Sequence, residues 1–229
     1  MATTQVLLIH GVGEQISAKD NPRCATLLGV PEQALSLHDW SKRLDTSWLD
    51  GKKRRRFFKW NPMRKLLNLD VWGDRVDDVL AYFLDKRLRT AAIAELRSRL
   101  STLPTGTILV AHSLGSVLLW QALQTPIIGD DGKQRVFKVI LLGSPIAMRG
   151  VRFLLWLDGV KHTPHAQLDV TNDPYAVILS GGKDPIAARG RRWCKEWPEP
   201  DLPLLGHDLF AYLKRASKYV GAWGCLDAR

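Results

Sequence analysis

A serine between small residues is the feature of this sequence best suited to chemistry. Ser113 lies between Ala111 and Gly115, after an apolar run and before a helix-forming run. This is the context of a nucleophile elbow, G-x-S-x-G, with Ala111 in place of the first glycine. We expect a turn from strand to helix so sharp that positions 111 and 115 approach each other and the serine backbone is strained. The alternative is an ordinary Ser/Gly turn at the end of a buried strand.

Short apolar runs that alternate with helical patterns set the frame around this serine. Four runs predict buried strands: Val6–Ile9, Thr107–Val110, Val136–Leu142 and Ala176–Leu179. Apolar residues at three- and four-residue steps predict one or two helices within Trp72–Leu100, a helix over Val117–Leu123 and a last helix over Leu209–Val220. Strands that alternate with helices indicate an α/β protein, a three-layer α/β/α sandwich with a mostly parallel sheet, in one domain over residues 1–229.

Composition narrows the class of protein and its surroundings. The chain has 229 residues and a formal net charge of +10, which favours acidic partners such as anionic lipid, nucleic acid or an anionic substrate. Its three cysteines are far apart in the sequence and form neither a disulfide framework nor a zinc motif. The chain start lacks the pattern of a secretory signal, and no window is long and apolar enough for a membrane span. A cytoplasmic location is therefore expected.

Four segments of the chain resemble compact lipase- and esterase-like members of the α/β-hydrolase superfamily. They are LLIHGVG (residues 7–13), VAHSLGSV (110–117), VILLGSP (139–145) and GHDLFAYL (206–213). The resemblance implies an α/β-hydrolase fold shortened at its N-terminus, because the strand that leads to the oxyanion hole opens the chain. It also implies a triad in the order Ser, acid, His, with no metal ion or organic cofactor.

Two backbone groups are expected to form an oxyanion hole, because acyl transfer needs donors aimed at the oxygen that becomes negative. One is the N–H of Leu114, the residue after the nucleophile. The other lies in the loop His10–Gly13, at Val12, whose neighbouring glycines let the backbone approach the substrate. A dinucleotide fingerprint would need glycine at position 16, where the chain has Ile16. An ordinary structural turn remains the alternative.

The order of the histidines selects the base. In this fold the acid follows the nucleophile and the base follows the acid, which excludes the three histidines at or before the elbow. His162 and His165 lie between two predicted strands and form an H-x-x-H without further metal ligands. His207 remains, directly before a helix for which Asp208 is the expected N-cap. The alternative for His207 is a helix-entry residue with only a capping role.

Two aspartates are candidates for the acid. Asp184 follows the predicted strand Ala176–Leu179 and a glycine turn, where this fold places its acid. The segment from Asp184 to Ala187 also resembles the D-P-[IV]-A of lipase-like relatives. Asp173 precedes the strand, in a Pro-containing turn, and would lie at the wrong edge of the sheet. The acid is therefore assigned to Asp184, which would orient the imidazole of His207.

Residues 146–170 lie where relatives commonly carry a small cap insertion. The stretch from Arg149 to Val160 is basic and amphipathic. Phe153 and Trp156 share one helical face and are large enough to line an acyl pocket or to contact an anionic membrane surface. A helix buried on the sheet is an equally good interpretation of this stretch.

These features predict hydrolysis of a carboxylic ester, in a small molecule or a lipid, through an acyl-enzyme on Ser113. The alternative is a catalytically idle hydrolase-fold module that docks to anionic lipid or nucleic acid through its basic surface. The complete set of Ser113, Asp184 and His207 favours the enzyme. The basic run Lys52–Arg56 is of a kind more often found in solvated loops, which argues against nucleic acid.

Overall fold

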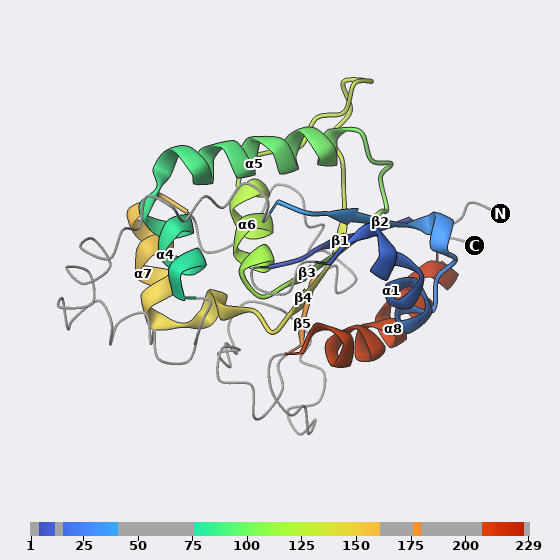
Figure 1. Ribbon diagram of the computed structural model, residues 1–229. Coiled ribbons are helices and arrows are strands. Elements are labelled where there is room, and N and C mark those ends of the chain that lie inside the picture. The colour runs from blue at the N-terminus through green and yellow to red at the C-terminus, as the bar shows by residue number, and fades with distance from the viewer. Residues whose placement is uncertain (1–4, 12–15, 41–75, 161–175, 180–207, 227–229) are drawn as a thin grey trace.

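Five parallel strands form the centre of the structure (Figure 1). The computed structural model describes residues 5–11, 16–40, 76–160, 176–179 and 208–226. The strands are β1 (Val6–Ile9), β2 (Leu35–His38), β3 (Ile108–His112), β4 (Lys138–Leu142) and β5 (Ala176–Leu179). They form one sheet in the order β2-β1-β3-β4-β5, in which every neighbouring pair is parallel.

Helices cover both faces of the sheet (Figure 1). They are α1 (Asn21–Leu28), α4 (Val76–Leu84), α5 (Lys86–Ser101), α6 (Leu114–Ala122), α7 (Arg149–Leu157) and α8 (Leu209–Leu226). Short 3-10 helices occur at η1 (Ala18–Asp20), η2 (Glu32–Ala34) and η5 (Pro145–Ala147). Within the described part of the chain, no helix combines the length and apolar character needed to cross a bilayer.

Two separate hydrophobic cores show that the protein has three layers. Successive side chains of a strand point to opposite faces of a sheet, so each strand contributes to both cores. Leu7 and Ile9 of β1 lie in the core under α4, α5, α6 and α7. Val6 and Leu8 lie in the core under α1 and α8. The predicted α/β/α sandwich is confirmed, and the sheet is parallel throughout the described strands.

The chain reverses its direction of travel across the sheet between β1 and β3. It runs from β1 outward to β2, returns past β1 to β3, and continues to β4 and β5. In open parallel sheets, ligand sites lie beyond the carboxyl ends of the strands at such a switch point. Here those two strand ends lead into Gly11, in the expected oxyanion loop, and Ser113, in the expected elbow.

The expected strands are present, with small shifts at their ends. β3 extends to His112 rather than Val110, and β4 begins at Lys138. The long helical stretch before β3 divides into α4 and α5 at Asp85. The side chain of Asp85 accepts hydrogen bonds from the backbone N–H groups of Arg87 and Leu88 and so caps α5. The sequence did not predict α1 and β2.

Candidate active site

Ser113 occupies the turn between β3 and α6. Its backbone has φ 55° and ψ −130°, and among the described residues it is the only one other than glycine with a positive φ. This conformation is close to that of the first central residue of a type II′ turn, where glycine is strongly preferred. α6 begins at the next residue, Leu114, so no loop separates strand and helix. The sharp, strained turn expected at Ser113 is present.

A chain of hydrogen bonds fixes this turn. The N–H of Ser113 donates to the carbonyl of Leu142 at 2.9 Å, which ties the turn to β4. Ser116 Oγ lies 2.5 Å from the Ser113 carbonyl oxygen and 2.6 Å from Ser144 Oγ, and the N–H of Ile146 donates to Ser144 Oγ at 3.3 Å. Each hydroxyl donates one proton, so Ser144 donates to Ser116, and Ser116 donates to the Ser113 carbonyl.

The hydroxyl of Ser113 differs from those of Ser116 and Ser144 because it has no hydrogen-bond partner in the part of the chain that the structure describes. The side chain is fully buried, and Oγ forms no hydrogen bond with any described residue. A buried hydroxyl that stays unpaired is unfavourable by about 1–3 kcal/mol, so this one needs a partner outside the described residues or a function. The first N–H groups of α6 have no acceptor within the helix, and their dipoles favour negative charge beside Ser113.

The end of β1 lies directly against this turn. A Cβ added at Gly11 would be 2.7 Å from Ser113 Cβ, 2.8 Å from His112 O and 3.0 Å from the backbone nitrogen of Leu114. No side chain fits at these distances, so position 11 requires glycine. The chain therefore leaves β1 beside the N–H of Leu114, the donor expected in the oxyanion hole.

Gly115 is required by the same contact between β1 and the elbow. A Cβ at this position would lie 2.6 Å from His10 O and 2.7 Å from Ile9 O. The sequence predicts a small residue at position 115 from its approach to Ala111, and it does not predict this contact with β1. The closest neighbours belong to the end of β1, because the first turn of α6 packs on that backbone.

Aromatic rings connect the elbow to the start of α8. The rings of His10 and His112 are stacked, with centroids 5.6 Å apart and planes 6° from parallel. His112 also contacts Tyr212 of α8, at 5.8 Å between centroids. One turn before Tyr212, Asp208 Oδ1 accepts a hydrogen bond from the N–H of Phe210 at 3.0 Å. The expected N-cap at Asp208 is therefore confirmed, and α8 starts close to the carboxyl end of β3.

Helix α7 has a buried face and an exposed apolar face. Val151 and Leu155 are buried in the core that lies under α4, α5 and α6. Phe153, Trp156 and Leu157 are 43%, 62% and 58% exposed, and the rings of Phe153 and Trp156 stack at 6.1 Å. The helix thus packs one side on the core, while its two large aromatic residues face solvent.

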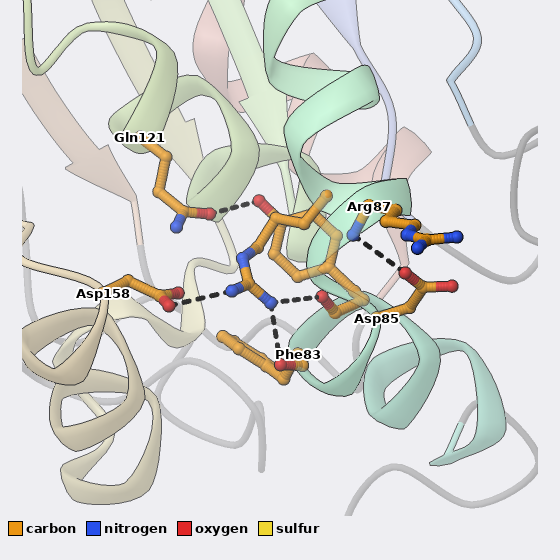
Figure 2. A network of polar contacts seen from close by, with 7 residues as sticks. Phe83, Asp85, Arg87, Gln121 and Asp158 are labelled. Atoms are coloured by element: carbon orange, nitrogen blue, oxygen red, sulfur yellow. Dashed lines mark hydrogen bonds and ion pairs between the residues drawn. The ribbon is translucent and has the colours of Figure 1, made fainter.

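A buried arginine fixes the end of α7 on the neighbouring helices (Figure 2). Arg89 Nη1 donates to the carbonyls of Tyr82 and Phe83 at 3.0 and 2.7 Å, and Nη2 bonds to Asp158 Oδ1 at 2.8 Å. The hydroxyl of Tyr82 hydrogen-bonds to the side chain of Gln121 in α6. Burial raises the pKa of this hydroxyl well above its usual range, so it remains a donor. The network joins α4, α5, α6 and the end of α7.

The structure places only some of the residues predicted for the site. Ser113 and Leu114 form the elbow, and Phe153 and Trp156 lie on α7. The predicted second oxyanion donor and the predicted acid and base, Val12, Asp184 and His207, lie outside the described residues. Within those residues, no group of three or more His, Cys, Asp or Glu side chains is placed to hold a metal ion.

Sequence reasoning missed the two hydroxyls that support the elbow. Ser116, in the first turn of α6, and Ser144, just after β4, each follow a glycine, Gly115 and Gly143. That shared Gly-Ser pattern is the only signal in the sequence, and it does not predict that the two side chains meet.

Neither protein-family models nor the curated proteins compared with this sequence match it. The fold and the turn at Ser113 define the chain as a parallel α/β protein with a strained serine at the switch point of its sheet.

Proposed function

We propose that this protein is a serine hydrolase of the α/β-hydrolase type that cleaves carboxylic esters, with Ser113 as its nucleophile. The observation that carries the proposal is the backbone of Ser113, with φ 55° and ψ −130° between a central strand and a helix. Strain of this kind persists where function requires it, and the nucleophile elbow requires this turn. The strand order by itself supports only the fold, because unrelated doubly wound proteins share it.

The described neighbours of Val12 support its proposed role in the oxyanion hole. Gly11 lies against the Cβ of Ser113 and the nitrogen of Leu114. Val12 is the next residue, so its N–H belongs to the peptide that directly follows this contact. Two N–H groups next to the nucleophile are what a tetrahedral intermediate needs to stabilise its oxyanion.

The described neighbours of His207 and Asp184 support the proposed base and acid. Consecutive Cα atoms are about 3.8 Å apart, so His207 is held close to Asp208, the N-cap of α8. One turn further into α8, Tyr212 contacts the residue before Ser113. Asp184 follows the end of β5, and in an all-parallel sheet that end shares an edge with the end of β3.

The proposed reaction follows from these roles. His207 takes the proton of Ser113 as Oγ bonds to the ester carbonyl carbon, and the carbonyl oxygen becomes an oxyanion bound by the N–H groups of Val12 and Leu114. The intermediate collapses, the alkoxide leaves with the proton from His207, and an acyl-enzyme remains. His207 then deprotonates a water molecule, which releases the carboxylic acid and restores Ser113. Asp184 orients the imidazole and stabilises its cation.

A series of p-nitrophenyl esters from acetate to palmitate tests this function. The native protein should release p-nitrophenol, and the Ser113→Ala variant should lose turnover by several orders of magnitude. Ser116→Ala is a matched control, because it removes a hydroxyl three residues away that supports the elbow without attacking the substrate. A native protein without turnover on any ester of the series would contradict the proposal and favour a non-catalytic binding module.

The two candidate acids are separated by equivalent substitutions. Each substitution removes one charge at nearly constant volume, so the two variants can be compared directly. Asp184→Asn should lose most of the turnover, whereas Asp173→Asn should retain it, because Asp173 precedes the strand that Asp184 follows. The opposite result would mean that the acid lies at the other edge of the sheet from the one proposed.

A further inference from the structure

The outer face of α7 presents a patch of apolar side chains to solvent. Phe153, Trp156 and Leu157 are the members of this patch on α7, and each is about half exposed or more. Leu84, at the end of α4, is also 40% exposed. The rings of Phe153 and Trp156 stack on each other, and exposed apolar side chains that lie together on a globular protein mark a surface that binds something.

This face is held in a fixed position. Val151 and Leu155 anchor the opposite side of α7 in the core. At its C-terminus the N–H of Gly159, at φ 74°, donates to Trp156 O, and the N–H of Val160 donates to Leu155 O. These two bonds form a Schellman motif, which ends the helix cleanly. The ion pair of Arg89 with the C-cap residue Asp158 fixes the same end (Figure 2).

Exposed basic side chains lie at this end of the molecule, beside two acidic residues that are already bonded: Asp85 caps α5, and Asp158 pairs with Arg89. Lys86 and Arg87 are exposed in the first turn of α5, next to Arg89, and neither forms an ion pair with any described residue. Figure 2 shows the Arg87 side chain pointing away from the buried network. Arg152, on the outer side of α7, is exposed too. The whole chain carries a formal net charge of +10.

We propose that the outer face of α7 and the basic start of α5 form a docking surface for an anionic lipid bilayer. Tryptophan and phenylalanine are the side chains that favour the interface between headgroups and acyl chains, and basic residues bind the anionic headgroups. A second copy of this chain would bring the same positive charge to the contact. Nucleic acid would stack on the aromatic rings but would leave Leu157 without an apolar environment.

The position of α7 gives this docking a consequence for the proposed function. α7 follows the carboxyl end of β4, and β4 pairs with β3, whose own end carries Ser113. A bilayer bound to α7 would therefore meet the same edge of the sheet as the nucleophile. Docking itself needs no catalysis, so the Ser113→Ala variant should bind vesicles as the native protein does.

Vesicle co-sedimentation with the full chain tests the docking surface. The native protein should sediment with vesicles of phosphatidylcholine and phosphatidylglycerol, bind pure phosphatidylcholine much less, and lose binding in high salt. Trp156→Ala and Phe153→Ser should each lower the partition coefficient about tenfold. The double variant Lys86→Glu and Arg87→Glu should lower it at least as much on anionic vesicles. Thermal melts of all variants should match the native protein, because these side chains are exposed.

The hairpin around the bridge between Ile128 and Gln134 provides matched controls. Ile128 is 51% exposed and Lys133 is exposed, so Ile128→Ser and Lys133→Glu remove the same kinds of group at another place. Both controls should bind anionic vesicles normally. Native protein that fails to bind anionic vesicles would overturn the proposal, as would an equal loss of binding in the hairpin variants. The proposal would also be overturned if the native protein bound no vesicles and instead formed a dimer or a nucleic-acid complex that Trp156→Ala abolishes.

Discussion

Replacing Ser113 by glycine should give a more stable protein than replacing it by alanine. Both substitutions remove the hydroxyl, so the difference between the two variants isolates the backbone. At φ 55° and ψ −130°, a residue with a Cβ is strained by about 1–3 kcal/mol. Glycine avoids this strain but loses about 0.5–1 kcal/mol through its greater freedom in the unfolded chain. The Ser113→Gly variant should therefore be more stable than Ser113→Ala by about 1 kcal/mol.

Ser116 offers a control three residues along the chain. It is also buried, but it lies in the first turn of α6 with an ordinary helical backbone. Without strain to relieve, glycine only adds flexibility to the unfolded state, so Ser116→Ala should be more stable than Ser116→Gly by about 0.5–1 kcal/mol. The sign of the difference between glycine and alanine should thus reverse between Ser113 and Ser116.

Urea unfolding of the four variants, followed by tryptophan fluorescence, gives the free energies needed. In thermal unfolding the same differences correspond to about 2–4 °C per kcal/mol for a chain of this size. If alanine were more stable than glycine at both positions, Ser113 would not occupy a strained turn. The structural reason for assigning it as the nucleophile would then be lost.

Three further tests, the first two with matched controls, concern the packing of buried groups. Gly11→Ala should destabilise the protein by about 1–3 kcal/mol, because its Cβ would lie 2.7 Å from that of residue 113. The control is Gly221→Ala in α8, where a Cβ meets nothing within 4 Å; it should stabilise the protein slightly. Arg89→Met should lower the free energy of unfolding by about 3 kcal/mol, because it removes a buried guanidinium from two carbonyls and a carboxylate. The control Asp131→Asn, at an exposed ion pair, should change that free energy little. Burial raises the pKa of the Cys24 thiol to about 11, so in native protein at pH 8 this residue should react slowly with iodoacetamide. The unfolded chain loses this proton at lower pH than the folded protein, so the stability that Cys24 contributes should fall as the pH rises from 9.0 to about 11.

Each of these expectations has a result that contradicts it. Urea titrations that show Gly11→Ala as stable as the native protein would mean that β1 does not press against the elbow. An Arg89→Met variant no less stable than Asp131→Asn would remove the network that holds α7. Peptide mapping that finds Cys24 alkylated as fast in native protein as in urea would place that thiol at the surface.

The fold could be predicted because buried parallel strands leave a strong signal. β1, β3 and β4 are mostly apolar along their whole length, since side chains of each strand are buried in the cores on both faces of the sheet. β2 lies at the edge of the sheet, and its four residues Leu35–His38 alternate apolar and polar side chains. Such a short alternation cannot be told from a loop. α1 was missed for a similar reason, because only Cys24, Ala25 and Leu28 of its eight residues are buried.

The candidate site could be predicted only as far as local chain geometry extends. The elbow at Ser113 depends on consecutive residues, so its sequence motif was sufficient. The bond between Ser116 and Ser144 joins residues 28 positions apart and depends on the alignment of β3 with β4. The contact of Gly115 with His10 depends in the same way on the alignment of β1 with β3. Strand registers of this kind follow from the packing of the whole sheet rather than from one segment.

The exposed face of α7 shows a different limit. Its sequence is amphipathic, which is equally consistent with a helix on the core and with a helix at a membrane surface. The structure separates the two faces, because Val151 and Leu155 are buried while Trp156 is 62% exposed. Apolar residues lie on both sides of this helix, so a periodicity argument could not decide which side meets the core.

The most direct test of Ser113 as the nucleophile is the position at which a fluorophosphonate probe attaches to the 229-residue chain, mapped by mass spectrometry of its peptides. Because the Ser113 hydroxyl is buried, the surrounding chain must move to admit the probe, and labelling should be followed until it is complete. We expect one adduct, on Ser113 Oγ, that is absent from the Ser113→Ala variant and retained in Ser116→Ala. An adduct on another serine, or labelling that persists in Ser113→Ala, would contradict it.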